Sequence, residues 1–218
     1  MSSPVATALI DYVGALLLLT MILILGSSQI YRTIYAVAAQ SAFLAAAAAV
    51  LAVATGNPDL WVIAGLTIVV KAGLLPWLLI RVVRRIGVKR EIEPVVPTLL
   101  TLAIAAGTVV LSFQLATSLG AVRQTITGNA LPVGVALTLL GVLVMASRKT
   151  ALAQMVGLFA CENGIFFTAI AVSQGMPLII EIGVLLDVVL GALVMGIMVL
   201  RVRSSVDADI ADLSRLRA

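Results

Sequence analysis

Three charged residues, Lys71, Glu162 and Asp187, fall in the middle of long apolar stretches of the sequence. A charged side chain at the centre of a bilayer costs roughly 2.5 to 3.5 kcal/mol, so such residues normally face protein or trapped water. They commonly serve the movement of protons or ions. Two carboxyls and one ammonium at similar depth therefore predict a site for proton or ion movement inside a membrane protein.

Glu162 borders a stripe of small and polar residues on its predicted helix. Gln154, Gly157, Cys161 and Thr168 recur at spacings of three, four and seven residues, which places them on one helix face. Small residues let a second helix approach closely, so this face is expected to contact protein. We interpret Glu162 as a proton-path residue; the alternative is a protonated carboxyl that only hydrogen-bonds a neighbouring helix.

Asp187 lies between two glycines, Gly183 and Gly191, each four residues away and on the same helix face. Glycines on both sides favour close approach of a partner helix, which would bury Asp187 against protein. Glu181 precedes Asp187 on a different face and roughly 9 Å nearer the outer surface, at about 1.5 Å per residue. It is either an entry group for the path or an interfacial residue that reaches water.

Lys71 shares a predicted helix face with Thr67 and stands just before Pro76. Proline has no N–H, so the carbonyl of Ala72 loses its helical donor and the helix is expected to be irregular beside the lysine. A buried ammonium needs a carboxylate or water as its partner, because an unpaired charge is too costly to bury. The alternative, a lysine that snorkels to the surface, would require its stem to span about half the bilayer.

The composition places these residues in a membrane protein. Hydrophobic residues make up 62% of the 218 residues and charged residues only 11%, with a mean hydropathy of +1.20. An ordinary soluble domain does not have this composition. The apolar runs are each near the ~20 residues that cross a bilayer as a helix. We predict an all-α, polytopic bundle, one integral membrane domain over residues 1–218, with about seven spans: Ala6–Ser27, Ile30–Ala54, Leu60–Ile80, Val95–Leu119, Leu131–Ala146, Thr150–Ser173 and Leu178–Leu200.

The basic residues predict the orientation. With the N-terminus outside, twelve of them lie at the cytoplasmic ends or in the cytoplasmic segments, including a tail over residues 204–218. They are Arg32, Arg81, Arg84, Arg85, Lys89, Arg90, Arg148, Lys149, Arg201, Arg203, Arg215 and Arg217. Arg123 alone then lies outside, so the positive-inside rule is strongly satisfied. The membrane topology explains the excess of basic over acidic residues, so no nucleic-acid partner is expected.

The chain offers few groups for holding a cofactor. It has no histidine and one cysteine, Cys161. A haem held by two histidines is excluded, and a zinc or iron–sulfur site formed by this chain is not expected. No catalytic, metal-binding or cofactor-binding residue is therefore predicted in this chain.

Residues 131–203 resemble the K subunit of respiratory complex I, a three-span protein. The run Leu140–Lys149 leads into Met155-Val-Gly-Leu and then Asn163, much as in that family. The family's first key glutamate falls at the position of Phe159, whereas this chain places its carboxyl at Glu162, nearly one turn later. The family's second glutamate matches Asp187, with its glycine four residues on. The resemblance implies that these two carboxyls belong to a proton path.

The whole chain resembles the hydrogenase-4 component E family of formate hydrogenlyase complexes. The resemblance rests on the order of the spans, the segment Lys71-Ala-Gly-Leu-Leu-Pro-Trp-Leu78 and the basic stretch Arg81–Arg90. It implies a non-catalytic subunit of a group 4 NiFe hydrogenase, in a bacterial or archaeal plasma membrane. The NiFe centre and iron–sulfur clusters would then lie in soluble partner subunits. The membrane partners would be antiporter-like and complex I-like subunits, surrounded by lipid.

Two other functions fit the same residues. The chain could be a component of a multisubunit cation/proton antiporter, which would assemble without any metalloenzyme. It could also be a structural membrane anchor for the hydrogenase, with its charges locked in ion pairs. The expected path residues are Glu162, Asp187, Lys71 and Glu181, and whether protons or sodium ions move is left open.

Overall fold

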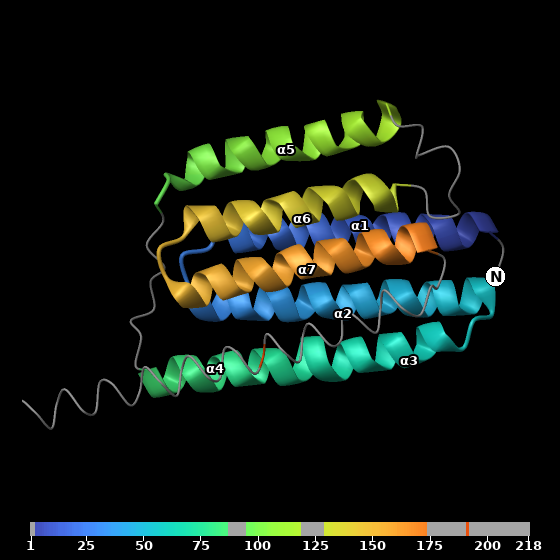
Figure 1. Cartoon of the computed structure of the whole chain (residues 1–218), viewed down its shortest axis with the longest axis horizontal. Coiled ribbons are helices and arrows are strands. Elements are labelled where there is room, and N and C mark those ends of the chain that lie inside the picture. The colour runs from blue at the N-terminus through green and yellow to red at the C-terminus, as the bar shows by residue number, and fades with distance from the viewer. Residues whose placement is uncertain (1–2, 87–94, 119–128, 174–190, 192–218) are drawn as a thin grey trace, which may run out of the picture.

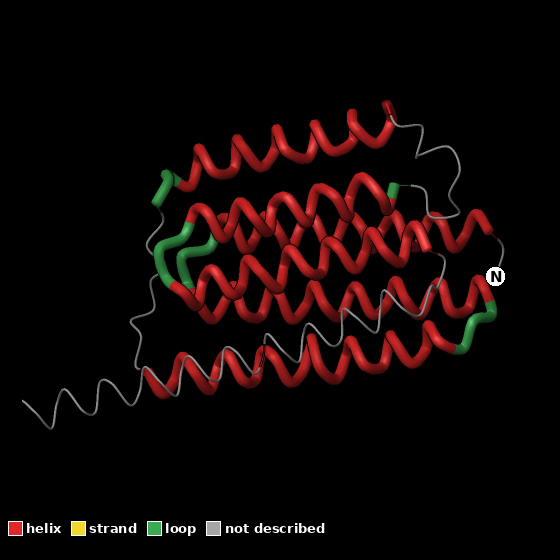
Figure 2. The backbone as a smooth tube through the Cα atoms, viewed as in Figure 1, coloured by secondary structure: helices red, strands yellow, loops and turns green. Residues whose placement is uncertain are grey.

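The described part of the molecule is a bundle of long helices, with no strand among its residues (Figures 1 and 2). The computed structural model describes residues 3–86, 95–118, 129–173 and 191. The helices are α1 (Ser3–Gly26), α2 (Ile30–Thr55), α3 (Asp59–Leu66), the π-helical segment η1 (Thr67–Leu74), α4 (Leu75–Ile86), α5 (Thr98–Ser118), α6 (Ala130–Ser147) and α7 (Ala151–Ser173). Because α3, η1 and α4 follow one another without a break, they form one continuous rod.

Six helical stretches in the described residues are long and apolar enough to cross a membrane. They are Pro4–Gly26, Ile30–Thr55, Asp59–Arg84, Thr98–Ser118, Ala130–Ser147 and Leu152–Ile170. These helices are those of a multi-pass membrane protein, and the first six predicted spans are confirmed as apolar helices of spanning length, with ends shifted by a few residues. The seventh predicted span, Leu178–Leu200, lies outside the described residues apart from Gly191, so the count of seven stays a prediction. The tail over residues 204–218 also lies outside them.

The turn between α2 and α3 falls in the gap between the predicted spans Ile30–Ala54 and Leu60–Ile80. Gly56 has a φ of 71°, a left-handed conformation that glycine adopts without steric cost, and its N–H donates to the carbonyl of Ala52. The Asn57 side-chain oxygen then accepts the N–H of Asp59 at 3.0 Å, which starts α3. The chain reverses here within a few residues, so α3 returns alongside α2.

Helix α7 lies at the centre of the bundle and α5 at its edge (Figure 1). In the α7 span 72% of the residues are buried within the protein, against 22% in the α5 span. Large side chains of α5 point outward, Leu99 being 82% exposed, as expected for a helix that faces lipid or another subunit. Among the spans that the structure describes, Glu162 therefore belongs to the one most buried within the protein.

Helices α6 and α7 pack against each other through glycines from both sides. A Cβ built on Gly134 or Gly141 of α6 would collide with the backbone of α7, and one on Gly164 would collide with the backbone of α6. At Gly157 it would come within 2.8 Å of Met145 Cγ. The two backbones thus approach closely in antiparallel fashion, as small residues allow in membranes. The small face predicted for α7 is confirmed as the face that contacts α6.

Arg148, in the connection between α6 and α7, clamps the end of α1. Its Nη2 lies 2.7 Å from the carbonyl oxygen of Leu25, 3.1 Å from that of Ser27 and 3.4 Å from that of Ile24. These carbonyls have no intrahelical donors, so the guanidinium satisfies the C-terminus of α1. Burial lowers the pKa of Arg148, yet an arginine stays charged in proteins. The α1–α2 and α6–α7 connections are thereby held at the same end of the bundle (Figure 1).

Candidate functional site

Lys71 projects from a π-helical segment that ends just before Pro76. The N–H of Leu75 donates to the carbonyl of Val70, five residues earlier, instead of the α-helical four. This matches the irregularity expected from Pro76, which cannot donate to Ala72. The interruption takes the form of eight residues of wider helix inside an otherwise continuous rod. Single π-helical turns of this kind are frequent at functional sites.

Lys71 and Glu162 form an ion pair in the interior of the bundle. Lys71 Nζ lies 3.1 Å from Glu162 Oε1, and the two side chains are only 5% and 7% exposed. The ammonium also stands over the ring of Phe166, 5.3 Å from its centroid, which adds a cation–π attraction. Both residues lie near the middle of helices long enough to cross a membrane, as predicted from the sequence. The expected partner of Lys71, a carboxylate or water, is a carboxylate.

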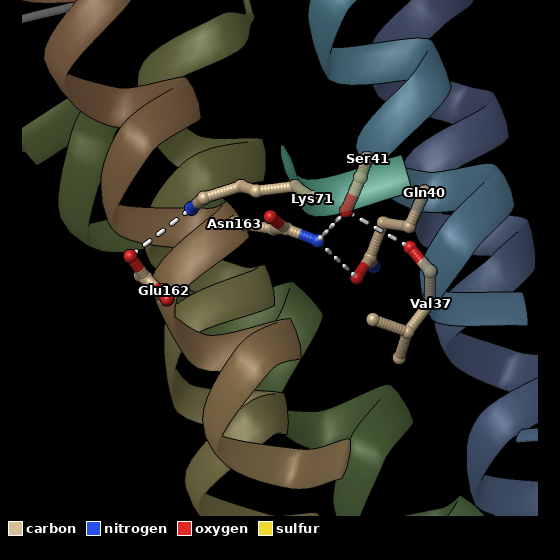
Figure 3. Close-up of polar contacts among 6 residues, drawn as sticks. All are labelled: Val37, Gln40, Ser41, Lys71, Glu162 and Asn163. Atoms are coloured by element: carbon tan, nitrogen blue, oxygen red, sulfur yellow. Dashed lines mark hydrogen bonds and ion pairs between the residues drawn. The ribbon is translucent and has the colours of Figure 1, made fainter. Parts of the chain in front are cut away.

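A cluster of uncharged polar side chains lies beside this pair (Figure 3). Asn163 Nδ2 donates to Gln40 Oε1 at 3.2 Å and to Ser41 Oγ at 3.1 Å, which joins α7 to α2. Ser41 Oγ donates in turn to the carbonyl of Val37 at 3.0 Å. Gln40 Nε2 lies 3.4 Å from the carbonyl oxygen of Leu17, which extends the cluster to α1. Polar groups from four elements thus meet at one depth, where hydrocarbon offers them no other partners.

A small cavity of about 10 Å³ opens next to the ion pair. Its polar lining comes from Ser41, Lys71, Glu162 and Asn163, so it touches both the charged pair and the uncharged cluster. The remaining lining is apolar: Ile34, Val37, Leu75, Pro76, Leu79 and Phe159. The cavity therefore has a mainly apolar wall that is bordered by these four polar residues.

The predicted path residues divide into two groups. The structure brings Lys71 and Glu162 together, although two spans, α5 and α6, lie between them in the chain. Asp187 and Glu181 lie outside the described residues, and their contribution stays a prediction. Gly191, predicted to share a face with Asp187, is described: a Cβ built on it would lie 3.5 Å from Leu75 of α4, one of the residues that line the cavity.

Gln40 and Ser41 were not among the predicted site residues, and Asn163 entered only through the family resemblance. A signal for the first two was present in the sequence. They are adjacent polar residues in the otherwise apolar stretch 36–54 of the span Ile30–Thr55. An amide in hydrocarbon needs a partner for the same reason that a charge does.

The arrangement has the parts that a proton or ion relay needs. The ion pair holds two opposite charges that depend on each other, because either alone would be an uncompensated charge in low dielectric. If a proton reached the carboxylate, the attraction that holds the ammonium would be lost. A change of protonation at Glu162 would thus change the electrostatic attraction on Lys71 and on the helix that carries it.

The full chain aligns with a mycobacterial protein. It is 32% identical over 219 residues to a protein of Mycobacterium tuberculosis (strain H37Rv) described as "Uncharacterized protein Rv0085", and the alignment covers 100% of both chains. The chain belongs to the Rv0085 family. No family model matches the chain, and no solved structure matches it.

The Rv0085 family is thus defined over the whole length, from α1 through the residues beyond α7. The description of the mycobacterial member names no activity, so kinship with it carries no reaction or partner to this chain.

Proposed function

We propose that the protein is a membrane-arm subunit of a complex I-related, energy-converting NiFe hydrogenase of the formate hydrogenlyase type. In this role it contributes buried charges to a lateral path for protons or ions. The observation that supports the proposal is the buried Lys71–Glu162 ion pair, with 3.1 Å between Nζ and Oε1, in which Lys71 comes from the π-helical segment and Glu162 from the middle of α7. Intramembrane charges of this kind mark proton and ion pathways more often than they serve packing.

The choice of this complex rests on the resemblance of the sequence to the hydrogenase-4 component E family. The Lys71–Leu78 segment, the order of the spans and the likeness of residues 131–203 to the complex I K subunit carry it. On this proposal the chain holds no metal centre. Soluble partner subunits carry the NiFe centre and iron–sulfur clusters, and the membrane partners are antiporter-like and complex I-like. The complex would reside in a bacterial or archaeal plasma membrane.

A second candidate function is favoured by the same ion pair. A structural anchor for the hydrogenase would also keep its buried charges neutralised in pairs, and the 3.1 Å contact fits that role. The two functions differ in what removal of the pair does. A path subunit loses coupling and keeps its assembly, whereas an anchor without charge transfer keeps coupling whenever it assembles.

Removing both charges together should therefore stop ion pumping while the complex still assembles. We expect the double variant Lys71→Met/Glu162→Met to assemble, because a pair of apolar residues of similar volume often replaces a buried ion pair at little cost. Hydrogen chemistry in detergent, where no gradient opposes it, should persist. Ion pumping in sealed vesicles, followed with a pH-sensitive dye, should fall to near background. Asp187→Asn is expected to give the same defect.

The matched control is Asp59→Asn, which removes a carboxyl from the first turn of α3, at the end of the same rod. It should leave pumping unchanged. Full pumping by the double variant would rule out the path and favour the anchor. Co-purification of the chain without nickel or iron would point to an antiporter component instead.

The orientation is part of the proposal. The N-terminus is expected outside, with the α1–α2 and α6–α7 connections and the end of α4 at the cytoplasmic face, where the basic residues gather. Cysteines placed singly at positions 57, 86 and 208 test this with a membrane-impermeant thiol reagent on intact cells. Position 57 should react, and positions 86 and 208 should not. The native Cys161 is 9% exposed inside α7 and serves as the unreactive background. Labelling at 86 from outside would reverse the orientation.

A further inference from the structure

The hydrogen bonds of the uncharged cluster fix the direction in which the Asn163 amide points. The carbonyl oxygen of Leu17 can only accept, so Gln40 must present its Nε2 to it. The Gln40 oxygen then faces Asn163, which must present its own Nδ2. Ser41 requires the same arrangement, because it donates to the carbonyl of Val37 and accepts from Asn163. Two backbone carbonyls therefore determine which atom of the Asn163 amide is the oxygen.

The Asn163 oxygen consequently points away from Gln40 and Ser41, toward the side of Lys71. Figure 3 shows this oxygen on the opposite side of the amide from the two dashed bonds that Nδ2 makes. Asn163 also lines the cavity that Lys71 and Glu162 line. Asn163, Glu162 and Lys71 thus all line the same small space.

We propose that this cavity binds one water molecule, held between Asn163 Oδ1, Glu162 and Lys71. The space of about 10 Å³ suits a single water and nothing larger. A water there can donate one hydrogen to Asn163 Oδ1 and the other to the Glu162 carboxylate, and it can accept from the Lys71 ammonium. Three polar partners are the usual number for a buried water in a protein.

The uncharged cluster also limits where a proton on this water could go. Beyond Asn163, the donors of Gln40 and Ser41 are directed at the backbone carbonyls of Leu17 and Val37. Neither amides nor backbone carbonyls pass a proton on readily, so the cluster closes the site on the side of α1 and α2. Among the described residues that line the cavity, Lys71 and Glu162 are therefore the charged groups with which the water exchanges protons.

A structure of the full chain crystallised in a lipidic phase, at a resolution that shows water, tests the site directly. We expect density for one water at about 2.7–3.2 Å from Asn163 Oδ1 and from Lys71 Nζ or a Glu162 oxygen. The variant Val37→Ile adds one methyl group to an apolar wall of the cavity and keeps every polar residue, so it should displace the water. Val53→Ile makes the same change on the same helix at a half-exposed position and should keep it.

Absence of water density from the wild-type chain would overturn the proposal. Density that survives unchanged in the Val37→Ile chain would also overturn it, because the water would then lie outside the cavity. The site does not depend on the proposed function. A water bound in a protein that does not pump would contradict the proposed function and support the water site. Pumping by a protein that binds no water would support the proposed function and contradict the water site.

Discussion

Replacing Lys71 alone with methionine is expected to lower the free energy of unfolding by about 3–5 kcal/mol, because it leaves the Glu162 carboxylate buried without its counter-ion. Glu162→Met alone should have a similar effect through the stranded ammonium. The double variant should unfold close to the wild type, since an apolar pair of similar volume has no charge to compensate. Equilibrium unfolding in mixed micelles, titrated with SDS, measures all four chains.

The informative quantity is the difference between the double variant and the sum of the single ones. Residues in direct contact are expected to be strongly non-additive. Additive losses would mean that Lys71 and Glu162 do not stabilise each other. The charge-exchanged chain, Lys71→Glu/Glu162→Lys, provides a second check, because it restores opposite charges at the same two positions and should recover part of the lost stability.

The change Gly141→Ala should destabilise the chain by about 1–3 kcal/mol, the usual cost of overpacking. A Cβ at this position would lie 2.6 Å from the Cβ of Cys161 and closer still to the Cys161 backbone nitrogen. A helix backbone cannot yield locally as the end of a side chain can, so α6 and α7 would have to move apart. That movement would also disturb the residues next to Cys161 on α7, which include Glu162.

Gly107→Ala is the matched control, in the middle of α5. A Cβ on Gly107 meets no atom within 4 Å. Because alanine has the higher helix propensity by about 1 kcal/mol, this variant should be neutral or slightly more stable. The same SDS titration compares the two. An equal loss in both variants would show that the effect at Gly141 comes from removing any glycine and not from the α6–α7 contact.

The sequence predicted the spans well because each one is a local property. An apolar run of about 20 residues forms a helix in a bilayer whatever its neighbours are, since every backbone group must find its partner within the segment. The turn at Gly56 and the irregular helix before Pro76 were predictable for the same reason, because both follow from one residue's backbone chemistry. The end residues moved by a few positions, as helix ends commonly do.

Sequence reasoning was less able to identify the residues around the charges. The polar pair Gln40–Ser41 carried the same signal as Lys71, an unsuitable residue in the middle of an apolar span. A neutral amide costs less to bury than a charge, so it stands out less in the sequence. Asn163 gains its importance only from what surrounds it, namely Gln40 and Ser41 on α2 and the cavity on the other side.

By itself, the sequence indicated a multi-pass helical membrane protein in which Lys71 and Glu162 lie near the middle of their spans and need partners. Periodicity gives the depth of a residue and the face of the helix that carries it. It does not say which helices are neighbours, because the packing of spans depends on contacts between segments far apart in the chain. Only the tertiary structure decided that η1 lies close enough to α7 for Lys71 to pair with Glu162. The physical reason is side-chain packing. The close glycine contact between α6 and α7 and the hydrogen bond from the Asn163 side chain on α7 to Gln40 on α2 set this packing.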